Sequence, residues 1–188
     1  MASDAELSDF LKHIEKRAFK RALYHVRNEE SALDIVQDSM LKLAEHYGDR
    51  PAQELPMLFQ RILSNSTMDW FRRRKSREGV LVNFSDLADP GNEGEVDLLE
   101  GMLRADGSPL QDSTEASLEQ AQKLRVIEEA LQELPPRQRE AFLLRYWEEL
   151  DVAETAAAMG VSAGSVKVHC FRAVQALARN LHAKGITI

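Results

Sequence analysis

The sequence is poor in the features that mark disulfide-bonded, metal-binding and membrane-spanning proteins. Its single cysteine, Cys170, excludes an internal disulfide, and no CxxC pair or close histidine–cysteine cluster offers a zinc site. No apolar run approaches the length of a membrane span, and the acidic N-terminus, MASDAELSDF, has no signal-peptide core. We therefore expect a cytoplasmic protein without a metal, a cofactor or direct membrane insertion.

Catalytic groupings are also lacking. The five histidines are scattered along the chain, and no nucleophile–base pair or metal-ligand spacing emerges from them: His13, His25, His46, His169 and His182. The sequence therefore predicts a protein that is not an enzyme.

Negative charge is confined to one segment. The chain carries a net charge of −7, but nine acidic residues and one basic residue between Gly79 and Ser117 account for −8 of it. This segment is rich in Gly, Ser and Asp, and Pro90 and Pro109 interrupt it. It predicts an acidic flexible linker over 79–118.

Three helices are predicted before the linker. Ser3 and Glu6 form a capping-box pattern at the start of the first helix. The second begins near Ser31, and Gly48 is placed to stop it. Its apolar stripe consists of Leu33, Val36, Met40, Leu43 and Tyr47. The third begins at Pro56, a residue suited to a first helical turn. Its inward side consists of Leu58, Phe59, Ile62, Leu63, Ser66 and Trp70.

Two polar groupings on these helices have no obvious role in a core. Asp34, Gln37 and Asp38 share one face of the second helix, which alone indicates either a solvated face or a binding surface. The third helix ends in RRRKSR directly after two aromatic residues. Interleaved aromatic and cationic side chains suit nucleic acid, although RNA, anionic lipid and an acidic partner fit this patch equally.

A helix-turn-helix is predicted over residues 151–179. Ala156 permits a close helix crossing, Gly160 supplies the turn, and Ser162 is placed to cap the second helix. The inward stripe of that helix is Val166, Cys170, Ala173 and Leu177. The outward or flanking residues are Ser165, Lys167, Val168, His169 and Arg172. Such a pair of helices is either a DNA-reading module or an ordinary helical hairpin.

Two further helices precede this motif. One carries Leu124, Ile127, Leu131 and Leu134, and ends at Pro135–Pro136. The other runs from Arg137 to Leu150. The predicted fold is all-α, with two small helical domains joined by a long acidic flexible linker, the C-terminal domain containing the helix-turn-helix. The predicted boundaries are 1–78, 79–118 and 119–184.

In this order, the motifs resemble those of a known family, the group IV or extracytoplasmic-function (ECF) bacterial sigma factors of the sigma-70 family. Region 2.2 is matched by ALDIVQDSMLKLAEHY, and regions 2.3 and 2.4 by LPMLFQRILSNSTMDWFRRRKSR. Regions 4.1 and 4.2 are matched by LQELPPRQREAFLLRYWEELDVAETAAAMGVSAGSVKVHCFRAVQAL.

The resemblance implies a transcription initiation factor that binds RNA polymerase core and directs it to promoter DNA. It implies that Asp34, Gln37 and Asp38 bind the coiled coil of the largest core subunit. It also implies a second contact, with the flap of the second-largest subunit. Melting and reading of the −10 element fall to Asn65, Asp69, Arg72, Arg73, Arg74 and Lys75. The loop from Gly48 to Leu55 would capture a flipped base. Reading of the −35 element falls to Ser165, Lys167, Val168, His169 and Arg172. An anti-sigma factor is an implied partner, and the active protein would be associated with the nucleoid.

Two departures and one alternative function accompany this resemblance. The recognition helix has Val168 and His169 where the family commonly has a Ser–Arg pair, and the linker is long for the family. The linker acids either keep the protein soluble or occupy the RNA channel of polymerase and mask the basic patch in the free factor. The alternative function is a helix-turn-helix regulator that never joins polymerase. It explains residues 120–180, but it leaves the polar face of Asp34, Gln37 and Asp38 and the arginine cluster without a role.

Overall fold

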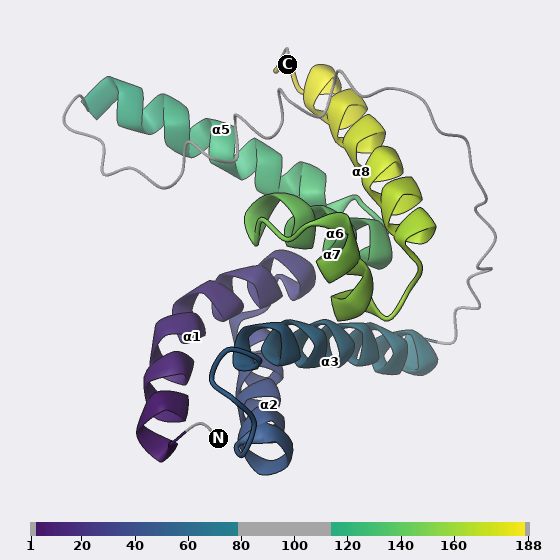
Figure 1. The fold of residues 1–188 in the computed structure, drawn as a ribbon. Coiled ribbons are helices and arrows are strands. Elements are labelled where there is room, and N and C mark those ends of the chain that lie inside the picture. The colour runs from purple at the N-terminus through teal and green to yellow at the C-terminus, as the bar shows by residue number, and fades with distance from the viewer. Residues whose placement is uncertain (1–2, 79–113, 187–188) are drawn as a thin grey trace. The chain divides into compact units, whose positions relative to one another are not determined.

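The computed structural model describes residues 3–78 and 114–186, and every regular element in these two ranges is helical (Figure 1). The predicted all-α class is therefore confirmed for the described part of the chain. Residues 79–113 of the predicted linker lie outside it.

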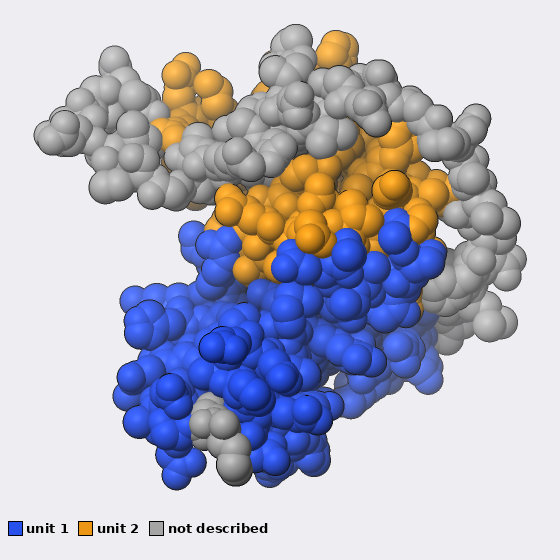
Figure 2. Space-filling model, in the orientation of Figure 1, with its two compact units in different colours: residues 1–86, 153–163 blue, residues 87–152, 164–188 orange. Residues whose placement is uncertain are grey.

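The chain divides into two compact units, residues 1–86 with 153–163 and residues 87–152 with 164–188 (Figure 2). The first contains α1 (Asp4–Val26), α2 (Glu29–Tyr47), α3 (Leu55–Glu78) and most of α7 (Val152–Met159). The second contains α5 (Thr114–Gln132), α6 (Pro136–Phe142), the π-helical η2 (Leu143–Trp147) and α8 (Ala163–Ala183). The predicted domain limits, which placed residues 151–163 with the C-terminal helices, stay a prediction.

The capping box predicted at the start of α1 is present. Ser3 Oγ accepts from the Glu6 backbone N–H at 3.3 Å, and the Glu6 carboxylate accepts from the Ser3 backbone N–H at 2.8 Å. These hydrogen bonds lower the pKa of the Glu6 carboxyl, because they favour its charged form.

The core of the first unit lies where α2 packs against both α1 and α3. Its fully buried apolar residues are Ala18, Ala22, Val26, Ala32, Ile35, Val36, Leu43, Leu55, Phe59 and Leu63. Alanines on α1 and at the start of α2 permit close approach, and leucine and phenylalanine from α3 fill the remaining space.

The predicted stripe of α2 is wrong at Leu33, which is 43% exposed. The buried arc instead includes Ala32, Ile35 and Ser39. A serine fits in this core because its Oγ donates to the Ile35 carbonyl at 2.7 Å, which removes the cost of burying an unpaired hydroxyl.

A buried cation links α1 to α3. The Arg21 side chain is 1% exposed and donates from its guanidinium to the Gln60 side-chain oxygen. Because an unpaired buried charge is costly, this hydrogen bond fixes how the two helices pair.

In the second unit, α5 begins at Thr114, earlier than the predicted linker boundary at 118. The sequence TEASLEQAQ contains no Gly or Pro and is rich in good helix formers, so the helix extends back into the predicted linker. Leu118, in this extension, is 60% exposed.

The C-terminal end of α5 is closed by a buried arginine from α6. The Arg139 guanidinium donates to the carbonyls of Leu131, Gln132 and Leu134, each at 2.8 Å, and the residue is 4% exposed. The carbonyls of Leu131 and Gln132 belong to the last turn of α5, where intrahelical donors run out, and that of Leu134 follows two residues later. One side chain therefore satisfies three acceptors and joins α5 to α6.

The predicted helix from Arg137 to Leu150 is shorter and less regular than expected. It changes to π-helical geometry at Leu143 and ends at Trp147, before Glu149 adopts a left-handed φ of 58°. Hydrogen bonds to the Leu143 carbonyl from Glu148 N and to the Leu144 carbonyl from Leu150 N replace the regular α-helical pattern.

The turn between α7 and α8 follows the prediction. Gly160 has a φ of +66°, in the left-handed region that residues with a Cβ avoid. Val161 N donates to the Ala156 carbonyl at 3.1 Å, and Ser162 immediately precedes α8, the position of a capping residue.

We predict that Arg139→Met destabilises the protein by about 3 kcal/mol or more, because three carbonyls, two of them in buried hydrogen bonds, lose a charged donor. Arg125→Met is the matched control, since Arg125 lies exposed on α5, and it should change stability by less than about 0.5 kcal/mol. Chemical unfolding of the full chain, followed by circular dichroism, measures both. Equal stabilities of the two variants would contradict a capping role for Arg139.

Candidate functional site

The polar face of α2 is exposed, as the sequence analysis anticipated. Asp34, Gln37 and Asp38 all lie on the solvent side of the helix, opposite the buried residues Val36 and Leu43. Leu41 projects from the same face and is 56% exposed. Sequence reasoning missed Leu41, although its position four residues after Gln37 would have placed it there. The face therefore combines carboxylates, an amide and an exposed apolar side chain.

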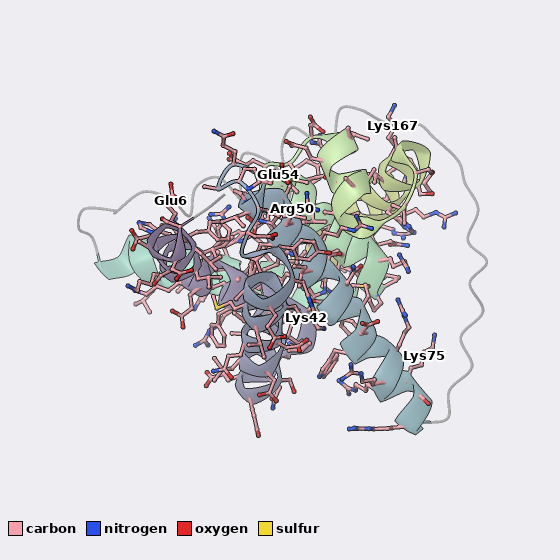
Figure 3. All side chains as sticks on the ribbon, turned by 60° about the horizontal axis from the view of Figure 1, so that its bottom comes forward. Glu6, Lys42, Arg50, Glu54, Lys75 and Lys167 are labelled. Carbon is pink, nitrogen blue, oxygen red and sulfur yellow. The ribbon has the colours of Figure 1, made fainter. Side chains whose placement is uncertain are left out.

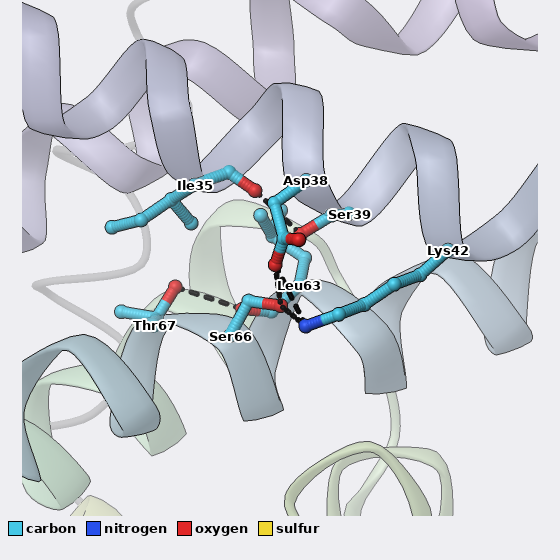
Figure 4. Close-up of polar contacts among 7 residues, drawn as sticks. All are labelled: Ile35, Asp38, Ser39, Lys42, Leu63, Ser66 and Thr67. Atoms are coloured by element: carbon cyan, nitrogen blue, oxygen red, sulfur yellow. Dashed lines mark hydrogen bonds and ion pairs between the residues drawn. The ribbon is translucent and has the colours of Figure 1, made fainter.

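Asp38 differs from Asp34 because its carboxylate forms an ion pair and a hydrogen bond with two neighbouring side chains. Its carboxylate pairs with Lys42 Nζ at 2.7 Å and accepts from Ser66 Oγ on α3 at 3.4 Å (Figure 4). Lys42 Nζ also donates to Ser66 Oγ at 3.4 Å. Asp38 is therefore part of the α2–α3 contact as well as the exposed face, and substituting it disturbs both.

The connection between α2 and α3 is held by local contacts. Arg50 and Glu54 form an ion pair at 3.9 Å. Gly48 ends α2 in an ordinary right-handed conformation, so its role is not that of a left-handed cap. A Cβ at Gly48 would lie 2.7 Å from the Ala44 carbonyl oxygen, and this close approach explains the glycine.

The loop before α3 and the basic cluster on α3 lie far apart. Because α3 is a single continuous helix, the loop and the basic cluster lie at its opposite ends, with Lys75 far from Arg50 and Glu54 in Figure 3. At a rise of 1.5 Å per residue, Leu55 and Arg72 are separated by about 25 Å along the axis. Asn65 is exposed between them.

At the C-terminal end of α3, aromatic and cationic side chains contact one another. The Arg74 guanidinium lies 5.4 Å from the Trp70 ring centroid, and Trp70 meets the Phe71 ring edge-on at 5.0 Å. Arg72 pairs with Asp69 at 3.2 Å, yet its side chain remains 70% exposed. Arg73 is exposed beside them. This end of the helix presents positive charge together with an aromatic surface.

The inward stripe predicted for α8 is confirmed. Its four members, Val166, Cys170, Ala173 and Leu177, are all buried. Burial raises the pKa of the Cys170 thiol to about 12, against a smaller opposing effect of Arg145. The thiol is therefore protonated at neutral pH and acts as a small apolar core group.

The outward residues of α8 differ in exposure. Lys167 is exposed and points away from the helix (Figure 3). The others are half-buried: Ser165, Val168, His169 and Arg172. One exposed cation beside several half-buried side chains suits a binding surface.

The surroundings of His169 disfavour its protonated form. Its pKa is lowered by burial, and further by the positive charges of Arg137 and Arg172. Arg137, on α6, therefore belongs to the surroundings of the predicted recognition surface. Sequence reasoning assigned it no function, because no spacing rule connects residues 32 positions apart.

Within the described residues, no helix is long and apolar enough to cross a membrane. In the same part of the chain, no group of three or more His, Cys, Asp or Glu side chains is arranged to hold a metal ion.

Residues 124–177 match the family model of sigma-70 region 4. The RNA polymerase sigma-E factor of Streptomyces coelicolor is 28% identical over 99% of this chain and 92% of its own length. The ECF RNA polymerase sigma factor BldN of the same organism is 37% identical over 87% of this chain and 55% of its own length. The RNA polymerase sigma factor SigV of Bacillus subtilis is 25% identical over 84% of this chain and 80% of its own length.

A similar fold occurs in a solved structure, the sigma factor RpoE in complex with the anti-sigma factor NepR from Bartonella quintana. The TM-score is 0.59 at 21% sequence identity, over 93% of this chain and 97% of that one. The matched region contains α6, η2, α7 and most of α8, and the full-length likeness to sigma-E extends over the helices of the first unit. Residues 124–177 therefore form a sigma-70 region 4, and the chain as a whole is similar to RNA polymerase sigma factors, among them members of the extracytoplasmic-function group.

Proposed function

We propose that this chain binds RNA polymerase core through α2, melts and reads the −10 element with α3, and reads the −35 element with α8. The observation that carries the proposal is the division of α8 into a fully buried apolar stripe and an opposite polar surface around Lys167. A helix held in this way by its own core can enter a major groove without unfolding.

The exposed face of α2 suits the coiled coil of the largest core subunit. Its carboxylates would pair with arginines, and Leu41 adds the apolar contact that commonly lies near the centre of a protein interface. The exposed Leu118 on α5 is a candidate contact for the flap of the second-largest subunit. An anti-sigma factor that covers either surface would keep the protein inactive, and the RpoE–NepR complex is a precedent for such a partner.

The loop before α3 and the C-terminal end of α3 would act separately on the −10 element. The loop before α3, with Asn65 farther along the helix, would hold an unstacked base, whose flipping costs a few kcal/mol. The cations from Arg72 to Lys75, about 25 Å away along the helix, would hold backbone phosphates without regard to sequence. That separation equals about seven base pairs of duplex.

Single-round transcription tests the function as a whole. With purified core polymerase and a promoter selected from random DNA, the chain should produce a run-off transcript of defined start that core alone does not make. Permanganate footprinting should show unpaired thymines at the −10 element. A regulator that never joins polymerase would yield no specific transcript when it is added to core polymerase. That result would refute the proposal.

The core-binding face is best tested at Asp34, because Asp38 also joins α2 to α3. We predict that Asp34→Arg and Leu41→Ala each weaken core affinity by about tenfold or more, with unfolding stability nearly unchanged. Asp9→Arg, the same charge change at an exposed position of α1, is the control. Core affinity measured by fluorescence titration decides the matter: if Asp34→Arg and Asp9→Arg bind alike, this face is not the core contact.

Reading of the −35 element is tested at Lys167. We predict that Lys167→Ala costs about 1–3 kcal/mol of holoenzyme binding to the selected promoter, and that the loss is confined to one base position. Affinities for a set of promoters with single −35 substitutions reveal this pattern. A uniform loss over all promoters would make Lys167 a phosphate contact instead.

A further inference from the structure

An open groove runs between α1 and α2 on the surface of the first unit. It has a volume of about 340 Å³, and its apolar members, Leu7, Leu11 and Met40, come from both helices. Its charged members include Lys12 and Glu15 on α1. The third helix, α3, packs elsewhere, on the sides of α1 and α2 that carry the Arg21–Gln60 and Asp38–Ser66 contacts. The face that α1 and α2 form jointly is therefore open.

Two exposed leucines flank this groove on α2. Leu33 stands seven residues before Met40, so the two lie along one side of the helix, and Leu41 directly follows Met40. Leu33 is 43% exposed and Leu41 is 56% exposed. Within the described ranges, the third exposed large apolar side chain is Leu118 on α5. Because apolar side chains gathered on a surface mark interaction sites, the groove and its leucines indicate a docking face.

The two helices carry opposite charges at the outer edges of this face. On α1, Lys12, Lys16 and Lys20 follow one another at four-residue intervals, and all three are exposed. On α2, Glu30 and Asp34 have the same spacing and are also exposed. The face therefore has a basic edge on α1, an acidic edge on α2 and an apolar strip between them.

The opposite charges lie at the same level along the two helices. Leu11 and Met40 both line the groove, which sets the level of α1 against α2. The helices run antiparallel, joined by a short turn (Figure 1). Asp34 lies six residues from Met40 toward that turn, and the same number of residues from Leu11 ends between Lys16 and Lys20. Lys16 and Asp34 are therefore level with each other on opposite edges of the face.

We propose that this face binds a second copy of the chain, with α1 of each copy against α2 of the other and a two-fold axis along the groove. Rotation about an axis parallel to the helices exchanges the two edges and preserves the level along them. Lys16 of each copy would then meet Asp34 of the other, as an isologous interface requires. Leu33 and Leu41 would be covered, with the ion pairs on the rim, which is the common arrangement of an interface.

The size of the face suits a reversible dimer. α1 and α2 comprise 23 and 19 residues. Their joint face is therefore about 30 Å long and about 20 Å, or two helices, wide. It would bury about 600 Å² on each copy, which exceeds the total of about 1,000 Å² that a specific interface needs but is small for an obligate dimer. Salt should weaken the dimer, because ion pairs on an exposed rim are screened.

Such a dimer would control access to polymerase. Asp34 and Leu41, which it covers, are the residues proposed above to contact core, so this consequence rests on the proposed core-binding function. A second copy and core polymerase would compete for one face. The free factor would then be stored as an inactive dimer, and core would draw monomers from that store.

Sedimentation velocity of the full-length chain over a range of concentrations is the first test. The wild type should associate to a dimer as its concentration rises, and less so at high salt. Lys16→Glu should weaken the dimer by about tenfold or more, because like charges then meet in both halves. Lys123→Glu, the same charge change at an exposed position of α5, should not. Leu33→Asp should also weaken it, whereas Leu118→Asp should not. A monomeric wild type, or equal effects of a variant and its control, would overturn the proposal.

Charge exchange tests the two-fold arrangement itself. Asp34→Lys should weaken the dimer as Lys16→Glu does. An equimolar mixture of these two variants should regain wild-type association, because one half of the mixed interface has both charges exchanged and the other half is wild type. A single chain with both substitutions should associate as well. Since misfolded variants would not recover on mixing, failure to recover would show that Lys16 and Asp34 do not meet.

Titration of core polymerase separates the dimer from the proposed core-binding function. At concentrations where the wild type is monomeric, Lys16→Glu should bind core with wild-type affinity. At concentrations where the wild type is dimeric, Lys16→Glu should saturate core at a lower total concentration. A wild-type dimer that binds core intact would overturn the competition. If no variant binds core but charge exchange still restores the dimer, the proposed function fails and the dimer stands.

Discussion

Burial of one apolar face per helix holds each unit together, and it also decides which residues remain for binding. On α2 the buried arc runs through Ala32, Val36, Ser39 and Leu43, so the opposite arc, with Asp34 and Leu41, must face outward. On α8 the same division separates Val166 and its stripe from Lys167. In helices of only 19 and 21 residues, a core position and a binding position are never more than a few residues apart. A substitution at a binding residue therefore preserves the fold only if it does not disturb the packing of the neighbouring core side chain.

Polar groups inside the two units make the packing specific. Arg21 joins α1 to α3 through Gln60, and Arg139 joins α6 to the end of α5 through three carbonyls. Apolar contacts alone permit helices to slide or rotate against one another, whereas a buried guanidinium accepts only arrangements that supply its acceptors. These two arginines therefore restrict each small core to one arrangement. Neither of them lies on a surface proposed for DNA or polymerase.

Helical periodicity predicted the elements and the α8 stripe, because every apolar residue of that stripe is also a core residue. It failed at Leu33, which is exposed, and it missed Ser39, which is buried because its hydroxyl is satisfied by its own helix. The buried roles of Arg21 and Arg139 were not predictable either, because their partners lie on other helices and no local spacing reports them. The same holds for Arg137 beside His169. The exposed positions of Asp34 and Lys167 were predictable, and their partners were indicated by resemblance to a family and not by physical pattern.

The continuity of α3 has a consequence for how sequences of this kind can vary. The helix runs without interruption through Leu55–Glu78, and the residues proposed to act on the −10 element, from Asn65 to Lys75, lie in its second half. One inserted or deleted residue would rotate everything beyond it by about 100° and would carry the arginines off their face. A change of length in the connection between Gly48 and Glu54 has no such effect, because it does not rotate the residues of α3 relative to one another. Length differences among relatives should accordingly collect in that connection, and α3 should keep a constant number of residues.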